Sequence, residues 1–188
     1  MKITINASAL AIFAIALLSI ATAAQKTSTS AGPDCVRSAP APITKKNIFP
    51  RSKFSLSTDS KTGTEIVDLA ANGRLVIKNS GCEYYVLKLR FESARVAHDP
   101  ADAAFWYRNA AVRLDAISRG LESSIDLRQA AKKLRQVAGQ TKKGKPLKFG
   151  RDITFVPGEI RQFMTVDGVI KMRRGVYALE ITLAAGPL

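Results

Sequence analysis

The residue types and spacings in this 188-residue sequence match no complete motif for nucleophilic catalysis. Histidine occurs once, as His98, directly before Asp99. A Ser-His-Asp or Cys-His arrangement would have to use this histidine, but we expect Asp99 to cap a helix. The G-x-S-x-G sequence typical of serine hydrolases does not occur. We therefore predict no catalytic residue and interpret His98 as a loop residue.

Two short segments match known catalytic or phosphate-binding motifs only in part. Lys61-Thr62-Gly63 has the form of the last β-lactamase motif, but no serine has a lysine three residues later, as that chemistry requires. Gly139 to Lys145 has the spacing G-x-x-x-x-G-K of a phosphate-binding loop. It follows a predicted helix rather than a strand, and Pro146 replaces the Ser or Thr that would hold magnesium. We interpret the first segment as a turn and reject the second as a nucleotide site.

Metal and cofactor sites are not predicted. One histidine, two cysteines and 15 acidic residues show no spacing typical of zinc or calcium ligands. Carboxylate pairs that hydrolyse glycosides leave no motif, because their function depends on separation in space. A hydrolase of envelope polymers therefore stays open as an alternative.

The strongest functional signal is positive charge, with 29 Lys and Arg against 15 Asp and Glu and a net charge of +14. Such a charge attracts acidic proteins and anionic polymers or lipids without choosing among them. Three cations recur at i, i+4 and i+7 on one face of a predicted helix, and three lysines follow in the next loop: Arg128, Lys132, Arg135, Lys142, Lys143 and Lys145. We take these six residues as candidate partner contacts. A solvated helix face with an exposed loop is the alternative.

An aromatic run at residues 105–107 supplies a further candidate. Three consecutive residues of a helix cannot all point into one core. Trp106 falls on the predicted apolar stripe, so we take Tyr107 and the adjacent Arg108 as possible partner contacts. Packing of all three aromatic rings is the alternative.

The N-terminal residues predict export. Lys2 precedes an apolar run at residues 10–20, which ends in the small residues 21–24. This pattern is typical of a secretory signal, and an uncleaved anchor is the alternative. With the signal removed, we expect a periplasmic or secreted protein without integral membrane insertion.

The two cysteines, Cys35 and Cys82, both follow the predicted signal. An even number of cysteines in an exported chain predicts a disulfide between them, with two free thiols as the alternative. Neither belongs to a C-x-x-C sequence, so we expect a structural bridge.

The spacing of apolar residues changes along the chain and predicts the strands and helices that must position these candidates. Alternating apolar residues predict strands near residues 54–57, 64–70, 74–78 and 82–92. Helical spacing predicts two helices, one starting at the cap Asp99 and one near Ser123–Asp126. Four more strands are predicted at 153–156, 160–166, 169–173 and 176–183, with Asp167-Gly168 as a hairpin turn.

This order predicts an α+β domain of antiparallel meanders, about four strands, two helices and four strands, with the helix pair packed on the sheet and one disulfide. We expect a signal peptide at residues 1–24, an extended arm at 25–47 and one domain at 48–188. The leading hypothesis is an exported, non-enzymatic binding protein of inhibitor, immunity or envelope-factor type. Its partner would be an acidic protein or an anionic envelope component, with no nucleic acid expected. A peripheral envelope protein held by charge alone is a further alternative.

Overall fold

The computed structural model describes residues 38–70, 73–94, 98–140 and 146–187. Its elements, in chain order, are β1 (Lys53–Leu56), β2 (Thr62–Leu69), β3 (Gly73–Ser80), β4 (Tyr85–Ser93), α1 (Ala103–Ile117), α2 (Leu127–Gly139), β5 (Ile153–Val156), β6 (Arg161–Lys171), a 3-10 turn η1 (Arg173–Gly175) and β7 (Tyr177–Gly186).

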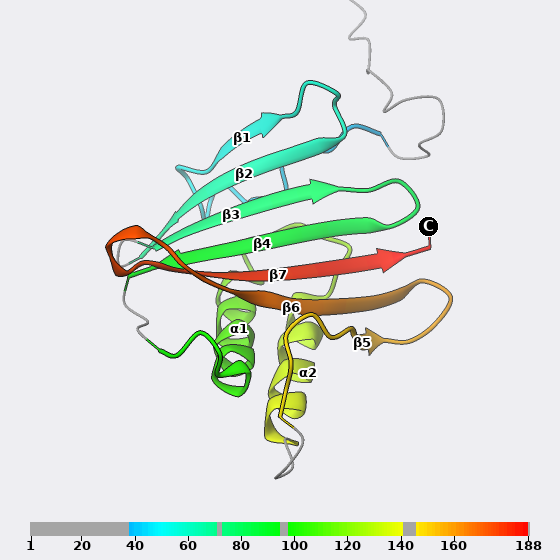
Figure 1. Ribbon diagram of the computed structural model, residues 1–188. Coiled ribbons are helices and arrows are strands. Elements are labelled where there is room, and N and C mark those ends of the chain that lie inside the picture. Colours follow the sequence, from blue (N-terminus) through cyan, green and yellow to red (C-terminus); the bar gives the residue numbers. More distant parts are fainter. Residues whose placement is uncertain (1–37, 71–72, 95–97, 141–145, 188) are drawn as a thin grey trace, which may run out of the picture.

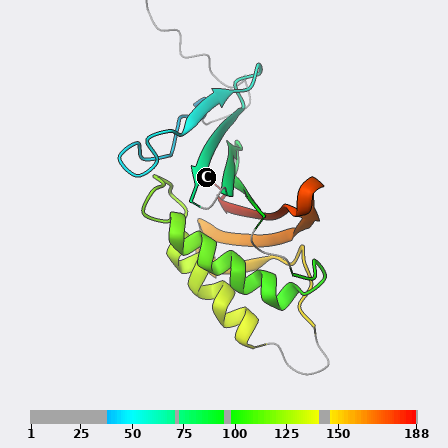
Figure 2. The same cartoon turned by 90° about the vertical axis from the view of Figure 1, so that its left-hand side faces the viewer.

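The strands form one seven-stranded antiparallel sheet in the order β1-β2-β3-β4-β7-β6-β5. The pairing of β4 with β7 joins the strands before the helices to those after them. Both helices lie against the same face of this curved sheet (Figures 1 and 2). No helix among the described residues is long and apolar enough to cross a membrane.

The predicted fold class is wrong in its strand count, because seven strands in a single sheet replace the eight strands in meanders. The difference arises at Asp167-Gly168, which we expected to be a hairpin turn. Strand β6 continues through this pair, and its register with β7 shifts between Val166 and Gly168. A β-bulge therefore absorbs the pair, and the chain reverses after Lys171 instead, where Gly175 adopts a φ of +70°.

The structure does not describe both cysteines of the predicted disulfide. Of the two cysteines, the described residues include only Cys82, in the turn between β3 and β4. Cys35 lies outside the described residues.

The core lies between the sheet and the helix pair. Alternate residues of the central strands point toward the helices and are buried, among them Leu75, Ile77, Leu87, Leu89, Phe91, Leu179, Ile181 and Leu183. The apolar stripe predicted for α1 is confirmed, since Trp106, Ala110 and Leu114 are all buried. On α2, Leu134 is buried in the same cluster. Burial of these apolar faces supplies most of the driving force for this layered arrangement.

Aspartate caps begin both helices, one of them later than predicted. The carboxylate of Asp102, not of Asp99, caps α1 by accepting a hydrogen bond from the Phe105 N–H at 3.0 Å. Asp99 lies in the preceding turn, where its carbonyl accepts a hydrogen bond from Trp106 Nε1 at 2.9 Å. Asp126 caps α2 by accepting from two backbone N–H groups. Each cap satisfies donors that the first helical turn leaves unpaired.

Residues 43–45 connect the sheet to the loop between the helices. The buried carboxylate of Glu65, on β2, accepts hydrogen bonds from the backbone N–H groups of Ile43 at 2.8 Å and Thr44 at 3.1 Å. The backbone of this segment also pairs with Gly120 and Glu122. Part of the predicted 25–47 arm is therefore packed into the domain.

Candidate functional site

Exposed cations gather on the outer surface of the helix pair, which we call the basic helical face: Arg108, Arg119, Arg128, Lys132 and Arg135. The two helices pack side by side, and side chains of α2 reach α1. Arg135 forms an ion pair with Asp115, and Arg128 Nε lies 3.4 Å from the Ser118 hydroxyl. Arg108 is seven residues before Asp115 and so lies on the same side of α1, two turns away. The structure thus brings Arg108 together with the predicted α2 stripe.

Most cations of the basic helical face form no direct ion pair with another described residue. Among the described residues, Arg135 forms an ion pair with Asp115. The other four cations of the face form no ion pair with a described residue. Val112 lies between Arg108 and Asp115 on α1, and 61% of its surface is exposed. The face therefore combines an apolar contact point with a net positive field.

Tyr107 does not belong to this surface, which corrects the prediction that it contacts a partner. Its ring is fully buried, and its hydroxyl donates a hydrogen bond to the Lys148 carbonyl at 2.8 Å. Burial raises the pKa of the Tyr107 phenol. Helix α1 packs against the sheet on one side and α2 on another, so its buried stripe is wide enough to include both Trp106 and Tyr107. The third ring, Phe105, is half-buried and stacks on His98 at a centroid distance of 3.7 Å.

Lys142, Lys143 and Lys145 lie outside the described residues, so their part in the basic surface stays a prediction. Within the described ranges, no group of His, Cys, Asp and Glu side chains could hold a metal ion.

A second candidate region lies on the sheet surface that faces away from the helices, which we call the open sheet face. It contains a cleft of about 570 Å³ lined by residues of β3, β4, β6 and β7. The strand register arranges its side chains in rows that run across the sheet. One row carries Val76, Arg90 and Glu180, and the next carries Lys78, Lys88 and Thr182.

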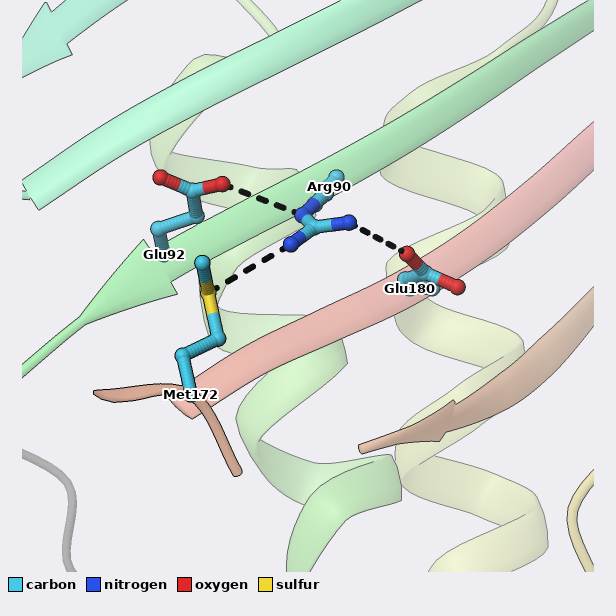
Figure 3. A network of polar contacts seen from close by, with 4 residues as sticks. All are labelled: Arg90, Glu92, Met172 and Glu180. Carbon is cyan, nitrogen blue, oxygen red and sulfur yellow. Dashed lines mark hydrogen bonds and ion pairs between the residues drawn. The ribbon is translucent and has the colours of Figure 1, made fainter. Parts of the chain in front are cut away.

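Arg90 organises one end of this cleft (Figure 3). Its Nε lies 3.0 Å from Glu92 Oε1 and its terminal nitrogen lies 3.2 Å from Glu180 Oε1. The other terminal nitrogen contacts the sulfur of Met172 at 3.4 Å. Both glutamates therefore serve as acceptors for one guanidinium, whose fixed fork suits such an arrangement.

Asp167 supplies the third carboxylate of the cleft lining. The hydroxyl of Thr182 donates a hydrogen bond to its Oδ2 at 2.7 Å, and the hydroxyl of Thr165 donates to its Oδ1. The bulge between Val166 and Gly168 sets the position of Asp167 beside β7. A pair of residues that we expected in a turn thus contributes to the cleft.

Lys78 and Lys88 differ from these groups in their direct cross-strand neighbours, none of which is a carboxylate. They lie directly opposite each other on β3 and β4, and both are exposed. Thr64 lies beyond Lys78 on β2, and Thr182 lies beyond Lys88 on β7. In the part of the chain that the structure describes, neither lysine forms an ion pair. Like charges directly opposite one another destabilise a sheet.

Sequence reasoning missed the open sheet face. Alternation places Lys88 and Arg90 on the outer side of their strand, but the cross-strand partners depend on register. The signal that could have indicated it is the set of charged residues at alternate positions of 74–78 and 88–92.

Comparisons of the chain with protein-family models, curated proteins and solved structures found no match.

Proposed function

We propose that the chain is an exported, non-enzymatic binding protein whose basic helical face contacts an acidic partner. The observation that carries this proposal is the gathering of five exposed cations, four on the two packed helices and Arg119 just after α1. Among the described residues, Asp115 forms an ion pair with one of them, Arg135. Export rests on the sequence of residues 1–24, which lie outside the described residues.

The arrangement suits recognition of a macromolecule. The helices are fixed to the sheet by buried residues such as Trp106 and Leu134, so the cations stand on a firm surface. A positive field on such a surface speeds the encounter with an acidic partner, and the exposed Val112 adds apolar area that excludes water. An acidic protein fits these features better than an anionic polymer, which would use charge alone.

The contacts in the cleft favour binding over the hydrolase alternative. A glycoside hydrolase needs two free carboxyl groups that flank the substrate, one of them protonated. Here Glu92 and Glu180 both bind Arg90, and Asp167 accepts hydrogen bonds from two threonines. All three carboxylates therefore already have an ion-pair or hydrogen-bond partner within the protein.

Charge reversal tests the proposal. Replacing Arg128, Lys132 and Arg135 by Glu should weaken binding of the mature protein to its captured partner by more than tenfold, because attraction becomes repulsion. The matched control reverses Arg51, Lys53 and Lys61, three exposed cations near β1. Capture from an envelope extract with elution along a salt gradient gives the readout.

The outcomes separate the alternatives. One protein retained stoichiometrically by wild type and control, but lost by the helix variant, supports the proposal. Equal retention of the partner by both variants would show that the basic helical face does not bind it. Elution of all bound material at moderate salt, from wild type and control alike, favours the peripheral envelope protein held by charge.

A further inference from the structure

We infer that Lys78 and Lys88, on the open sheet face, bind the phosphate group of a small hydroxyl-bearing ligand that occupies the cleft. The burial pattern of β3 and β4 places both lysines on the face opposite the core. Figures 1 and 2 show the helix pair on the other face of the sheet, so the inference is independent of the basic helical face.

The first argument is the unneutralised lysine pair. The two residues are direct cross-strand neighbours, which places their Cβ atoms about 5 Å apart. The two ammonium groups carry the same charge, and an anion bound between them would offset their repulsion.

The second argument is the contrast with the adjacent rows of the same face. Arg90 faces Glu180 across β4 and β7. In the next row, Arg74 lies between Asp68 and Glu92. In both rows each arginine has a glutamate directly opposite it, whereas the two lysines of the cleft face each other. A counter-charge supplied by a ligand would complete the pattern.

The third argument identifies the anion. A phosphate monoester carries close to two negative charges at pH 7, which matches two ammonium groups. Lysine binds phosphate as a compact point charge, whereas a planar carboxylate is better matched by the fork of arginine. Thr64, directly opposite Lys78, adds a hydroxyl at the edge of the row.

The remainder of the cleft indicates what the phosphate is attached to. Its volume of about 570 Å³ exceeds what a single phosphate fills and falls in the range of small-ligand sites. Asp167 and Glu180 line the side toward β6 and β7, and their oxygens, each of which accepts at most one hydrogen bond from the described residues, keep lone pairs for hydroxyl donors. A sugar phosphate therefore matches the cleft in both charge and hydrogen bonding.

The experiment measures thermal stabilisation and calorimetric binding of the full mature chain with inorganic phosphate, glucose 6-phosphate and glucose. We expect the melting temperature to rise with glucose 6-phosphate, to rise less with inorganic phosphate, and to stay unchanged with glucose. Lys78→Gln and Lys88→Gln should each weaken binding of glucose 6-phosphate by more than tenfold. Lys132→Gln on the basic helical face is the matched control and should bind as the wild type does.

A second readout does not depend on the ligand. Because each substitution removes a like-charge repulsion, Lys78→Gln and Lys88→Gln should fold at least as stably as the wild type without phosphate. Reduced binding by a stable variant then supports the inference directly. Unchanged affinity in both lysine variants, or no response of the wild type to any phosphate probe, would overturn it.

Vesicles distinguish the source of the phosphate. Binding to vesicles that contain phosphatidic acid, weakened by Lys78→Gln and stronger than binding to glucose 6-phosphate, would support the phosphate site and assign it to a lipid headgroup. Stronger binding of glucose 6-phosphate would assign it to a free sugar phosphate. Vesicle binding that Lys132→Gln weakens and Lys78→Gln leaves unchanged would place lipid contact on the helices and count against the cleft.

Discussion

The two faces of the sheet use charge in opposite ways. On the face that the helices cover, Glu65 is 2% exposed, and its oxygens accept hydrogen bonds from the backbone of Ile43 and Thr44. On the open sheet face, the Arg90 side chain is 34% exposed and pairs with side chains of neighbouring strands. The difference teaches that a buried charge here fixes the course of the chain, whereas the half-exposed charges form a surface that solvent and ligands can reach.

Energetics explain why this division is stable. A buried carboxylate costs several kcal/mol unless its oxygens are satisfied, so removing its partners or its charge has a large effect. A pair at the surface is screened by water, so it contributes about 1 kcal/mol or less. Substitutions on the two faces should therefore differ in size even where the chemistry is the same.

The largest expected effect on stability comes from comparing two neighbouring residues of one strand. Ile181 and Thr182 are neighbours on β7, one buried against the helices and one on the open sheet face. Ile181→Ala should lower the free energy of unfolding by about 4 kcal/mol, because it leaves a cavity in the core. Thr182→Ala should cost less than about 1 kcal/mol. Urea denaturation measures both, and similar losses would mean that the faces are not energetically distinct.

The second prediction compares two glutamates. Glu65→Gln replaces one acceptor oxygen with a donor and leaves a backbone N–H of residues 43–44 unpaired, at a cost of about 2 kcal/mol. Glu92→Gln is the matched control on the open sheet face and should cost less than about 1 kcal/mol. Hydrogen exchange should show faster exchange of the Ile43 and Thr44 amides only in Glu65→Gln. Unchanged exchange there would contradict the anchoring role of Glu65.

A third, smaller effect concerns the Arg90 pair with Glu180. Both side chains are about one-third exposed, at 34% and 36%, so solvent screening reduces their attraction. A double-mutant cycle with Arg90→Gln and Glu180→Gln should give a coupling energy of about 0.5 kcal/mol, which falls as salt is added. A coupling above about 2 kcal/mol would place this pair in the buried class with Glu65.

The smallest effect is a pH dependence at the start of α1. Hydrogen bonds from His98 and from the Phe105 N–H hold the pKa of the Asp102 carboxyl below its usual value of 3.8. A carboxyl with a lowered folded pKa stabilises the fold above its unfolded pKa, and this contribution is lost as the pH falls through the folded value.

Asparagine caps helices as well as aspartate does, so Asp102→Asn keeps the cap and removes the titration. The melting temperature of the wild type should therefore fall slightly more steeply than that of the variant as the pH drops below about 4. Parallel pH profiles would contradict a contribution from Asp102. Because this side chain is 40% exposed, the difference should be small.

Much of the layer arrangement could be predicted from local patterns. Alternation marks β2 to β4, and the spacing of Trp106, Ala110 and Leu114 marks the buried stripe of α1. These patterns succeed because burial on one face imposes a fixed period. Asp167-Gly168 misled because the same pair suits a turn or a bulge, and only pairing with β7 decides between them.

The candidate sites were less predictable for a related reason. The α2 stripe follows from helical geometry within one element, so Arg128, Lys132 and Arg135 could be placed on one face from the sequence. The burial of Tyr107 depends on α1 packing against two neighbours, which no local pattern reports. The opposition of Lys78 and Lys88 depends on strand register, which a one-residue slip would reverse.

The place of β7 in the sheet has a consequence for how the chain folds. This strand follows all the others in the sequence, yet it lies between β4 and β6, and its Glu180 meets Arg90 across 90 residues. Contacts of such long sequence separation slow folding, because loop closure must precede them. During synthesis, one edge of β4 would therefore stay unpaired until β7 emerges, although β1 to β4 and both helices are already made. The nascent chain should expose its apolar β4 surface to chaperones until that final insertion completes the sheet.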